Sequence, residues 1–559
     1  MATKIRMKAQ TSHQYIRCLR AQVIVVSSMM VGCALLAFGQ NGSAYFVPGN
    51  LVISRSVYDN NPNNVQVGQL LPPNCQQTQA GCNGNATNDG SYPLVWNNNL
   101  VDGSFGITSK IFLDQYTPAG VLVNSLEVPN SLQNGVPPMK DQMVTSFSSK
   151  SELALNLSLD GSYLTFMGYV SAVDNLDVSN SNTPAVVDPT NPVGANYYRA
   201  VAQVDYHGKF RFTATNAYSG NNGRAVIQNN VNGANFFYTA GNAGNGGNPQ
   251  PDNIIIAAGA QTIDPQIKAL TAQRPGLPTP VASFNVTQLG HKPDKIGKDD
   301  NFRGLTIFNN VLYYSKGSGG NGVNTVYWVD PTLTICNDSN GTGLPPAGAT
   351  LPTAPMVYDP TVLQSKGLDP NNMCVLKGLP TALKSTTSFP FGIWFANATT
   401  MYVADEGNGD NTFSNGLYTT AAAQTTAGLQ KWVFDPNTGQ WNLAYVLQSG
   451  LQLGVPYTVD NYPTGNNPAT GLPWSPGTDG LRNVTGIVNG DGTATLYAIT
   501  STVSGNGDQG ADPNKLVVIT DQISATSLPL NESFFTLAGA GYLEVLRGVS
   551  FTPRIAGAR

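Results

Sequence analysis

Four arginines recur at one place in a repeated sequence element, and their guanidinium groups are the side chains best suited to bind an anion. Each precedes a short apolar run. The elements read Arg224-Ala225-Val226-Ile227, Arg303-Gly304-Leu305, Arg482-Asn483-Val484 and Arg547-Gly548-Val549. Guanidinium groups bind carboxylate, sulfate or phosphate through two parallel hydrogen bonds. If the repeats are related by rotation, we expect an arginine ring. A structural role, in which each arginine bonds to carbonyls or an acidic residue of the next repeat, is favoured, and anion binding is the alternative.

Acidic residues on glycine-rich loops form a second candidate site. One loop reads Asp405-Glu406-Gly407-Asn408-Gly409-Asp410, and a second carries Asp508 and Asp512. Carboxylate and amide oxygens are the ligands that Ca²⁺ prefers, although the spacing is not that of an EF-hand. The sequence therefore favours ordinary turn chemistry at these acids, with a calcium site as the alternative.

Aromatic residues in a polar segment are a third candidate. Tyr462 and Trp474 lie in 451–480, which is rich in Pro, Gly and Asn. We expect them to be exposed, where their rings would stack on sugars.

Catalytic motifs are missing from the sequence. There is no Gly-x-Ser-x-Gly elbow, HExxH motif or phosphate-binding loop. After residue 39 the only histidines are His207 and His291, with no clustered partner, and turn roles are expected for both. We predict no catalytic residue.

The elements that would position these residues are short strands. Four times an aromatic run leads into Gly-Asn-Gly, at residues 244, 320, 407 and 505. The runs are Phe236-Phe237-Tyr238, Leu312-Tyr313-Tyr314, Met401-Tyr402-Val403 and Leu496-Tyr497-Ala498. Repeats of this size, rich in strand formers, predict an all-β propeller.

The repeat count predicts a single propeller of six blades, with seven as the alternative. Blades two to six span about 148–217, 223–290, 301–380, 388–450 and 481–540, and the first strand of blade two is expected over 153–159. The strands near 51–57, 111–116 and 121–128 lack a first strand, and the terminal strand 546–552 lacks partners. We expect them to complete one blade, which closes the ring and removes exposed sheet edges. Loop insertions are predicted near 60–108, 176–197, 331–389 and 451–480.

The N-terminus has the layout of a secretory signal. Five basic residues precede an uncharged apolar stretch, 21–38, which ends in Ala37-Phe38-Gly39. We predict a signal peptide at 1–39, a propeller domain at 40–559 and secretion, with a periplasmic or cell-surface location as the alternative. An uncleaved anchor and lipidation at Cys33 are alternative interpretations of the same stretch.

Charge and cysteine content narrow the class further. Only 11% of residues are charged, and the net charge is −4. A sparse, acidic surface argues against nucleic acid as a partner, and no second apolar stretch could span a membrane. Beyond residue 39, Cys75, Cys82, Cys336 and Cys374 remain; their even number predicts two disulfides, for which sequence proximity favours Cys75–Cys82 and Cys336–Cys374.

One blade carries a family resemblance. Pro390-Phe391-Gly392-Ile393, followed by Met401-Tyr402-Val403-Ala404-Asp405 and Gly407-Asn408, resembles an NHL-type propeller repeat. Blade six departs from it, with Ile499-Thr500 where Ala-Asp would stand. The chain is also similar to uncharacterised exported propeller proteins of environmental bacteria. The resemblance implies fold and secretion but no activity.

The sequence favours a monomeric binding or interaction module for a glycan, a peptide or a small anion. Two alternatives stay open. One is a metal-assisted hydrolase or lyase on a propeller scaffold; the other is a passive structural or cell-surface protein.

Overall fold

The computed structural model divides the chain into two units, Met1–Tyr45 and Phe46–Arg559, and all the strands belong to the second unit. The structure describes residues 44–71, 86–88, 90–96, 106–137, 141–147, 151–184, 186, 196–242, 259–265, 301–317, 323–332, 341–351, 373–382, 387–508 and 510–557. The signal peptide predicted at 1–39 lies outside them and stays a prediction. Among the described residues, no helix has the length and hydropathy needed to cross a bilayer.

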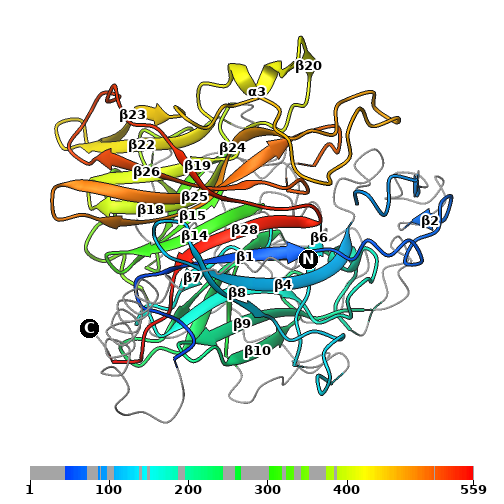
Figure 1. Ribbon diagram of the computed structural model, residues 1–559. Coiled ribbons are helices and arrows are strands. Elements are labelled where there is room, and N and C mark those ends of the chain that lie inside the picture. Colours follow the sequence, from blue (N-terminus) through cyan, green and yellow to red (C-terminus); the bar gives the residue numbers. More distant parts are fainter. Residues whose placement is uncertain are drawn as a thin grey trace, which may run out of the picture. The chain divides into compact units, whose positions relative to one another are not determined.

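Six antiparallel sheets form the blades of a propeller, which confirms the predicted fold class (Figure 1). From the inner to the outer strand, blade 1 contains β28 (Glu544–Phe551), β1 (Leu51–Val57), β4 (Ile107–Tyr116) and β5 (Leu122–Glu127). Blade 2 contains β7 (Asn156–Leu157), β8 (Tyr163–Tyr169), β9 (Arg199–Asp205) and β10 (Phe210–Thr215). Blade 3 contains β11 (Asn222–Asn229), β12 (Phe236–Asn242) and β13 (Ala260–Ile263).

The other three blades have four strands each. Blade 4 contains β14 (Phe302–Phe308), β15 (Val311–Lys316), β16 (Thr325–Val329) and β17 (Met373–Val375). Blade 5 contains β18 (Pro390–Asn397), β19 (Thr400–Asp405), β22 (Gly428–Asp435) and β23 (Gln440–Leu447). Blade 6 contains β24 (Gly477–Val488), β25 (Thr493–Val503), β26 (Lys515–Gln522) and β27 (Phe535–Gly539).

Short elements lie in the connections between the blade strands. They are β2 (Leu70–Leu71), β3 (Ala86–Thr87), β6 (Thr145–Phe147), the 3-10 helix Val178–Asn180, β20 (Phe413–Ser414), β21 (Leu417–Tyr418) and α3 (Thr419–Ala423). Of these, β6 pairs with the start of β4, and Val144 just before it bridges to Tyr169 at the end of β8. Blade 1 is thereby joined to blade 2.

The two ends of the propeller chain meet in blade 1, as predicted. The first long strand, β1, pairs antiparallel with the last strand, β28, with Leu51 opposite Phe551 and Val57 opposite Glu544. Figure 1 shows these strands, coloured blue and red, side by side. Closure gives every inner strand a neighbouring blade on each side.

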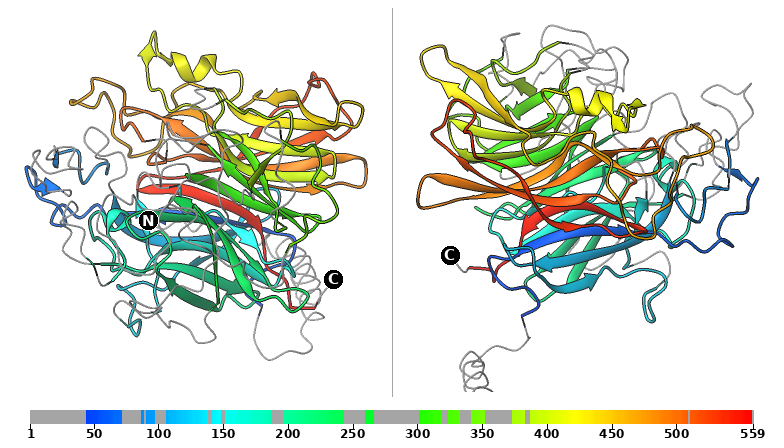
Figure 2. Two further views of the ribbon diagram at one scale, coloured as in Figure 1. Left: turned by 180° about the vertical axis from the view of Figure 1, so that it is seen from behind. Right: turned by 45° about the horizontal axis from the view of Figure 1, so that its top comes forward.

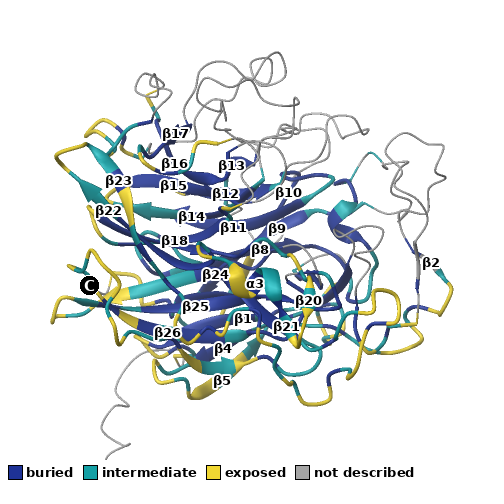
Figure 3. Cartoon of the chain, turned by 90° about the horizontal axis from the view of Figure 1, so that it is seen from above, coloured by how far each residue is buried: buried dark blue, intermediate teal, exposed yellow. Residues whose placement is uncertain are grey.

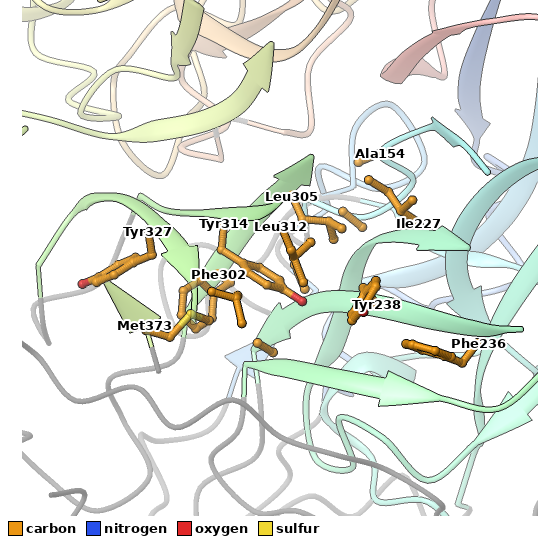
Figure 4. Packing of buried hydrophobic residues seen from close by; sticks show 14 of the residues in the cluster. Ala154, Ile227, Phe236, Tyr238, Phe302, Leu305, Leu312, Tyr314, Tyr327 and Met373 are labelled. Atoms are coloured by element: carbon orange, nitrogen blue, oxygen red, sulfur yellow. The ribbon is translucent and has the colours of Figure 1, made fainter. Parts of the chain in front are cut away.

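The strands near the middle of each blade are largely buried, whereas the outer strands β5 and β27 contain no buried residue (Figure 3). All eight residues of β11 are buried, whereas no residue of β5 is. The core lies between blades, where aromatic and aliphatic side chains of neighbouring sheets interdigitate. Between blades 3 and 4, Ile227 and Tyr238 meet Leu312 and Tyr314 (Figure 4). Strand formers thus bury their side chains on both faces of the inner strands.

The inner strands begin at the face of the disc where the second strands end. The register shows this directly, because Phe302 of β14 lies opposite Lys316 of β15, and Asn222 of β11 opposite Asn242 of β12. The connections that follow β1, β8, β19 and β25 therefore start on this face. The connection that precedes β24 ends on the same face. Figure 2 shows the same disc from two further directions.

The inner strand of blade 2 is shorter than predicted. It is only two residues long, whereas the sequence predicts a strand over 153–159. The strand is short because Ser151 and Leu153 have left-handed φ angles of 57° and 67°.

Cys374 is buried on β17 and is disulfide-bonded. Cys75, Cys82 and Cys336 lie outside the described residues, so the predicted pairing stays a prediction.

Candidate functional site

The four predicted arginines lie at equivalent positions around the centre of the disc. The inner strands are in register there, because the residue after each such position packs against the backbone of the next blade. A side chain at Gly304 would clash with the carbonyl of Phe391, one at Gly392 with the carbonyl of Arg482, and one at Gly548 with the carbonyl of Leu153. Two hydrogen bonds continue this series of contacts: the side-chain amide of Asn483 donates to the Arg547 carbonyl (2.6 Å), and the Ala154 amide donates to the Arg224 carbonyl (3.3 Å). Between blades 3 and 4, Arg224 Nη1 donates to the Phe302 carbonyl at 3.0 Å.

Each blade therefore contributes one equivalent inner-strand position to a ring of six. From blade 1 to blade 6 they are Arg547, Leu153, Arg224, Arg303, Phe391 and Arg482. We call the four arginines among them the arginine ring. The repeats are equivalent in the structure, so these four side chains lie together on one face of the disc.

At blade 5 the ring is neutralised by a glutamate. Glu406 follows β19 and is buried, and its carboxylate accepts from Arg482 Nε at 3.0 Å and contacts Arg303 Nη2 at 3.3 Å. The Phe391 ring lies between the same two arginines, 5.8 Å from Arg303 Cζ and 5.6 Å from Arg482 Cζ. Both contacts are within cation–π range. No local sequence signal identifies Glu406, because its two partners are far away along the chain.

At blade 2 the corresponding glutamate makes other bonds. Glu152 precedes Leu153 and is also buried. Its Oε2 accepts from Thr145 Oγ1 at 2.7 Å and from the Ser146 amide at 3.0 Å, and its Oε1 accepts from the Tyr169 hydroxyl. Burial raises the pKa of the Glu152 carboxyl, partly offset by these hydrogen bonds and by the charge of Arg547. Glu152 therefore acts on the ring at a distance only.

The arginines beside blade 2 keep unpaired N–H groups. Arg547 donates from Nε to Ser56 Oγ at 3.2 Å, but within the described part of the chain its Nη1 and Nη2 have no hydrogen-bond partner. Arg224 donates from Nη1 to the Phe302 carbonyl at 3.0 Å and also to Asn301, while its Nε has no partner there. Both side chains are at least nine-tenths buried, at 3% and 4% exposure. Such groups are costly to bury unpaired.

Electrostatics shows the same deficit of negative charge. Burial lowers the pKa of the Arg547 guanidinium to about 10 and that of Arg224 well below its usual value, and the charge of Arg303 lowers that of Arg224 further. Asp508 also acts on Arg547, and its Oδ1 accepts from the Gly510 amide at 2.8 Å. Within the described residues, four guanidinium groups thus face three carboxylates, those of Glu152, Glu406 and Asp508, so positive charge is in excess there.

The four predicted calcium ligands are not brought together. In the part of the chain that the structure describes, no group of three or more His, Cys, Asp or Glu side chains could hold a metal ion. Asp410 binds Thr412 in its own turn, whereas Asp512 accepts from Tyr462, Thr502 and Asn506 inside blade 6. The calcium site stays a prediction.

Tyr462 and Trp474 are not the exposed platforms that we expected. They are 8% and 7% exposed and pack with Val95, which comes from a distant segment. The Tyr462 hydroxyl donates to Asp512 at 2.7 Å. The segment 451–480 lies against the propeller here, so stacking of sugars on these two rings has no support.

A pH experiment tests the structural role of Asp405. Its carboxylate accepts from the amides of Phe389 (2.8 Å) and Gly407 (3.0 Å), and burial raises its pKa to about 7. Because the folded pKa exceeds the unfolded one, the folded state retains a proton between about pH 4 and 7 that the unfolded state has lost. Stability from this group should fall as the pH rises through that window. We expect Asp405→Asn to flatten the pH dependence of Tm, while the same change at exposed Asp460 should not. Equal slopes for the wild type and Asp405→Asn would contradict this assignment.

The fold and the site define the protein as a six-bladed propeller with an arginine ring on one face, whose positive charge is only partly balanced by carboxylates. No protein-family profile and no curated protein sequence matches the chain. Solved structures with some similarity include a PL25 ulvan lyase bound to a GlcA(1-4)Rha3S saccharide, at 10% identity over 90% of this chain and 97% of that chain, with a TM-score of 0.29. A mutant NanB sialidase from Streptococcus pneumoniae is 10% identical over 90% of this chain and 78% of that chain, with a TM-score of 0.20. At such low scores neither similarity supports a conclusion on function.

Proposed function

We propose that the protein is an exported binding module that holds an anionic group of its ligand in the arginine ring. The ligand is a small anion, or an acidic group on a glycan or peptide. The observation that carries the proposal is the guanidinium of Arg547, which is buried and whose two terminal nitrogens have no hydrogen-bond partner among the described residues. A bound anion would supply charge-assisted hydrogen bonds to these nitrogens.

A purely structural role for the ring explains only half of it. Arg303 and Arg482 share the carboxylate of Glu406 and therefore tie blades 4, 5 and 6 together. Arg547 has no such partner among the described residues, although it is as deeply buried. Buried charges that cost stability without a protein partner are characteristic of binding sites.

The test compares anion binding with stability in Arg547→Met. Calorimetry and thermal shifts would be measured with acetate, sulfate, phosphate and acidic sugars at constant ionic strength. We expect the wild type to be stabilised by at least one anion and the variant to lose most of that effect. Without ligand, the variant should be as stable as the wild type or more so, because methionine replaces an unpaired buried charge.

The control is Arg211→Gln, which removes an exposed arginine from β10. It lowers the net charge equally without touching the ring, so anion binding should persist. Strong destabilisation of Arg547→Met without ligand, together with no anion effect on the wild type, would indicate a structural ring and refute the proposal.

A further inference from the structure

The arginine ring has an approximate two-fold arrangement. Leu153 and Phe391, the two positions without arginine, belong to blades 2 and 5 and therefore lie opposite each other in a ring of six. Each separates two arginines, and each has a buried glutamate beside it. In blade 5, Pro390 pairs with Asp405 across β18 and β19, which brings Glu406 beside Phe391. In blade 2, Glu152 directly precedes Leu153.

The two halves differ in where the carboxylate lies. Glu406 contacts the arginines on both sides of Phe391, at 3.0 and 3.3 Å. Glu152 instead bonds to Thr145, Ser146 and Tyr169. The left-handed backbone at Ser151 and Leu153 makes the start of this inner strand irregular and so distinguishes blade 2 from blade 5.

The unpaired nitrogens are concentrated in the half that lacks a bridging carboxylate. They are Nη1 and Nη2 of Arg547 and Nε of Arg224, which flank Leu153. In the other half, Arg303 Nε is the unpaired atom among the described residues, and Arg303 already binds Glu406 and Ser151. The ring is therefore complete at blade 5 and incomplete at blade 2.

We propose that a carboxylate of the ligand lies between Arg547 and Arg224, in the place that the Glu406 carboxylate takes between Arg303 and Arg482. This inference rests on the proposed function and narrows its ligand to a chemical class, the carboxylates. A planar carboxylate presents two oxygens, one for each guanidinium, as Glu406 does.

The surroundings favour a carboxylate over sulfate or phosphate. Glu152 acts electrostatically on both Arg547 and Arg224, so a dianionic phosphate meets more repulsion than a singly charged group. Two of the described groups beside these arginines are apolar: Leu153 occupies the ring position, and the Phe147 ring lies 5.9 Å from Arg547 Cζ. They offer no donors for the third and fourth oxygens of a tetrahedral anion.

The experiment measures affinities by calorimetry at fixed ionic strength and pH 7. The probes are glucuronate, N-acetylglycine, inorganic sulfate, inorganic phosphate and glucose. We expect the carboxylates to bind roughly tenfold more tightly than sulfate or phosphate, and glucose not to bind. Preference for glucuronate over N-acetylglycine would identify an acidic sugar as the source of the carboxylate, and the reverse would identify a peptide. Sulfate or phosphate binding as tightly as the carboxylates would overturn the inference while leaving the proposed function standing.

Variants locate the carboxylate within the ring. We expect Arg547→Met and Arg224→Met each to weaken glucuronate or N-acetylglycine binding roughly a hundredfold, and Arg303→Met only about threefold, because the Arg303 guanidinium already binds Glu406 and Ser151. Arg547→Lys retains the charge and is used if a methionine variant does not fold. Its affinity for the carboxylate should still fall about tenfold, because an ammonium group lacks the paired N–H donors of the guanidinium. Equal losses at Arg303 and Arg547 would place the carboxylate elsewhere in the ring. Failure of every probe with the wild type would instead refute the proposed function itself.

Discussion

Replacing Glu406 by glutamine is expected to lower the free energy of unfolding by about 3–5 kcal/mol, because two buried guanidinium groups would lose their shared counter-charge. Glu406 is 1% exposed, and its partners Arg303 and Arg482 have side chains only 11% and 8% exposed. Glutamine offers one acceptor where the carboxylate offers two. Chemical denaturation followed by intrinsic fluorescence measures the loss.

A matched control is Glu544→Gln, which removes a carboxylate from a partly exposed ion pair with Arg55. Solvent screens this pair, so the loss should be about 1 kcal/mol or less. Added acetate should also raise the stability of a Glu406→Ala variant more than that of the wild type, because alanine, unlike glutamine, leaves room for a free carboxylate between the two guanidinium groups. Equal losses for the two glutamine variants would show that Glu406 does not neutralise the ring.

Replacing Lys431 by methionine is expected to destabilise the protein by a similar amount, about 3–5 kcal/mol, for the opposite electrostatic reason. Lys431 on β22 and Asp521 on β26 are both fully buried, with Nζ 2.8 Å from Oδ2. Nζ also donates to the Tyr445 hydroxyl at 2.8 Å and to the Gln522 carbonyl at 2.6 Å. Without the lysine, the Asp521 carboxylate is left as an uncompensated charge between blades 5 and 6.

The double variant Lys431→Met with Asp521→Leu separates charge from packing. Removing both charges should recover part of the stability, because an apolar pair of similar volume replaces a buried ion pair. Tyr402 and Tyr445 would each lose a bond to Asp521, so recovery should be incomplete. A double variant less stable than Lys431→Met would show that the hydrogen bonds to Asp521, rather than the ion pair, hold these strands.

The architecture could be predicted from the sequence because its signals are local. Strand formers closed by Gly and Asn recur at blade length, and each arginine sits beside its own inner strand. The equivalence of Arg224, Arg303, Arg482 and Arg547 therefore follows from repeat alignment alone, and the register of the inner strands agrees with it.

Features that depend on contacts between blades could not be predicted in this way. Glu406 lies 76 residues from Arg482, and nothing in its own loop distinguishes it from neighbouring Asp405. The burial of Trp474 depends on Val95, which belongs to another insertion. The short strand β7 results from left-handed residues at positions that are not glycine, for which the local sequence carries no clear signal.

The pairing of β1 with β28 has a consequence for synthesis. Ser56 and Val545, which are hydrogen-bonded across this pair, are 489 residues apart, so the first strand made waits for the last one. Blades 2 to 6 contain only strands that are already present, but blade 1 needs the end of the chain. Until then, β1 exposes one edge with unpaired amide and carbonyl groups to other chains. A chain interrupted before residue 544 would keep that edge, so only the full-length polypeptide can close the disc.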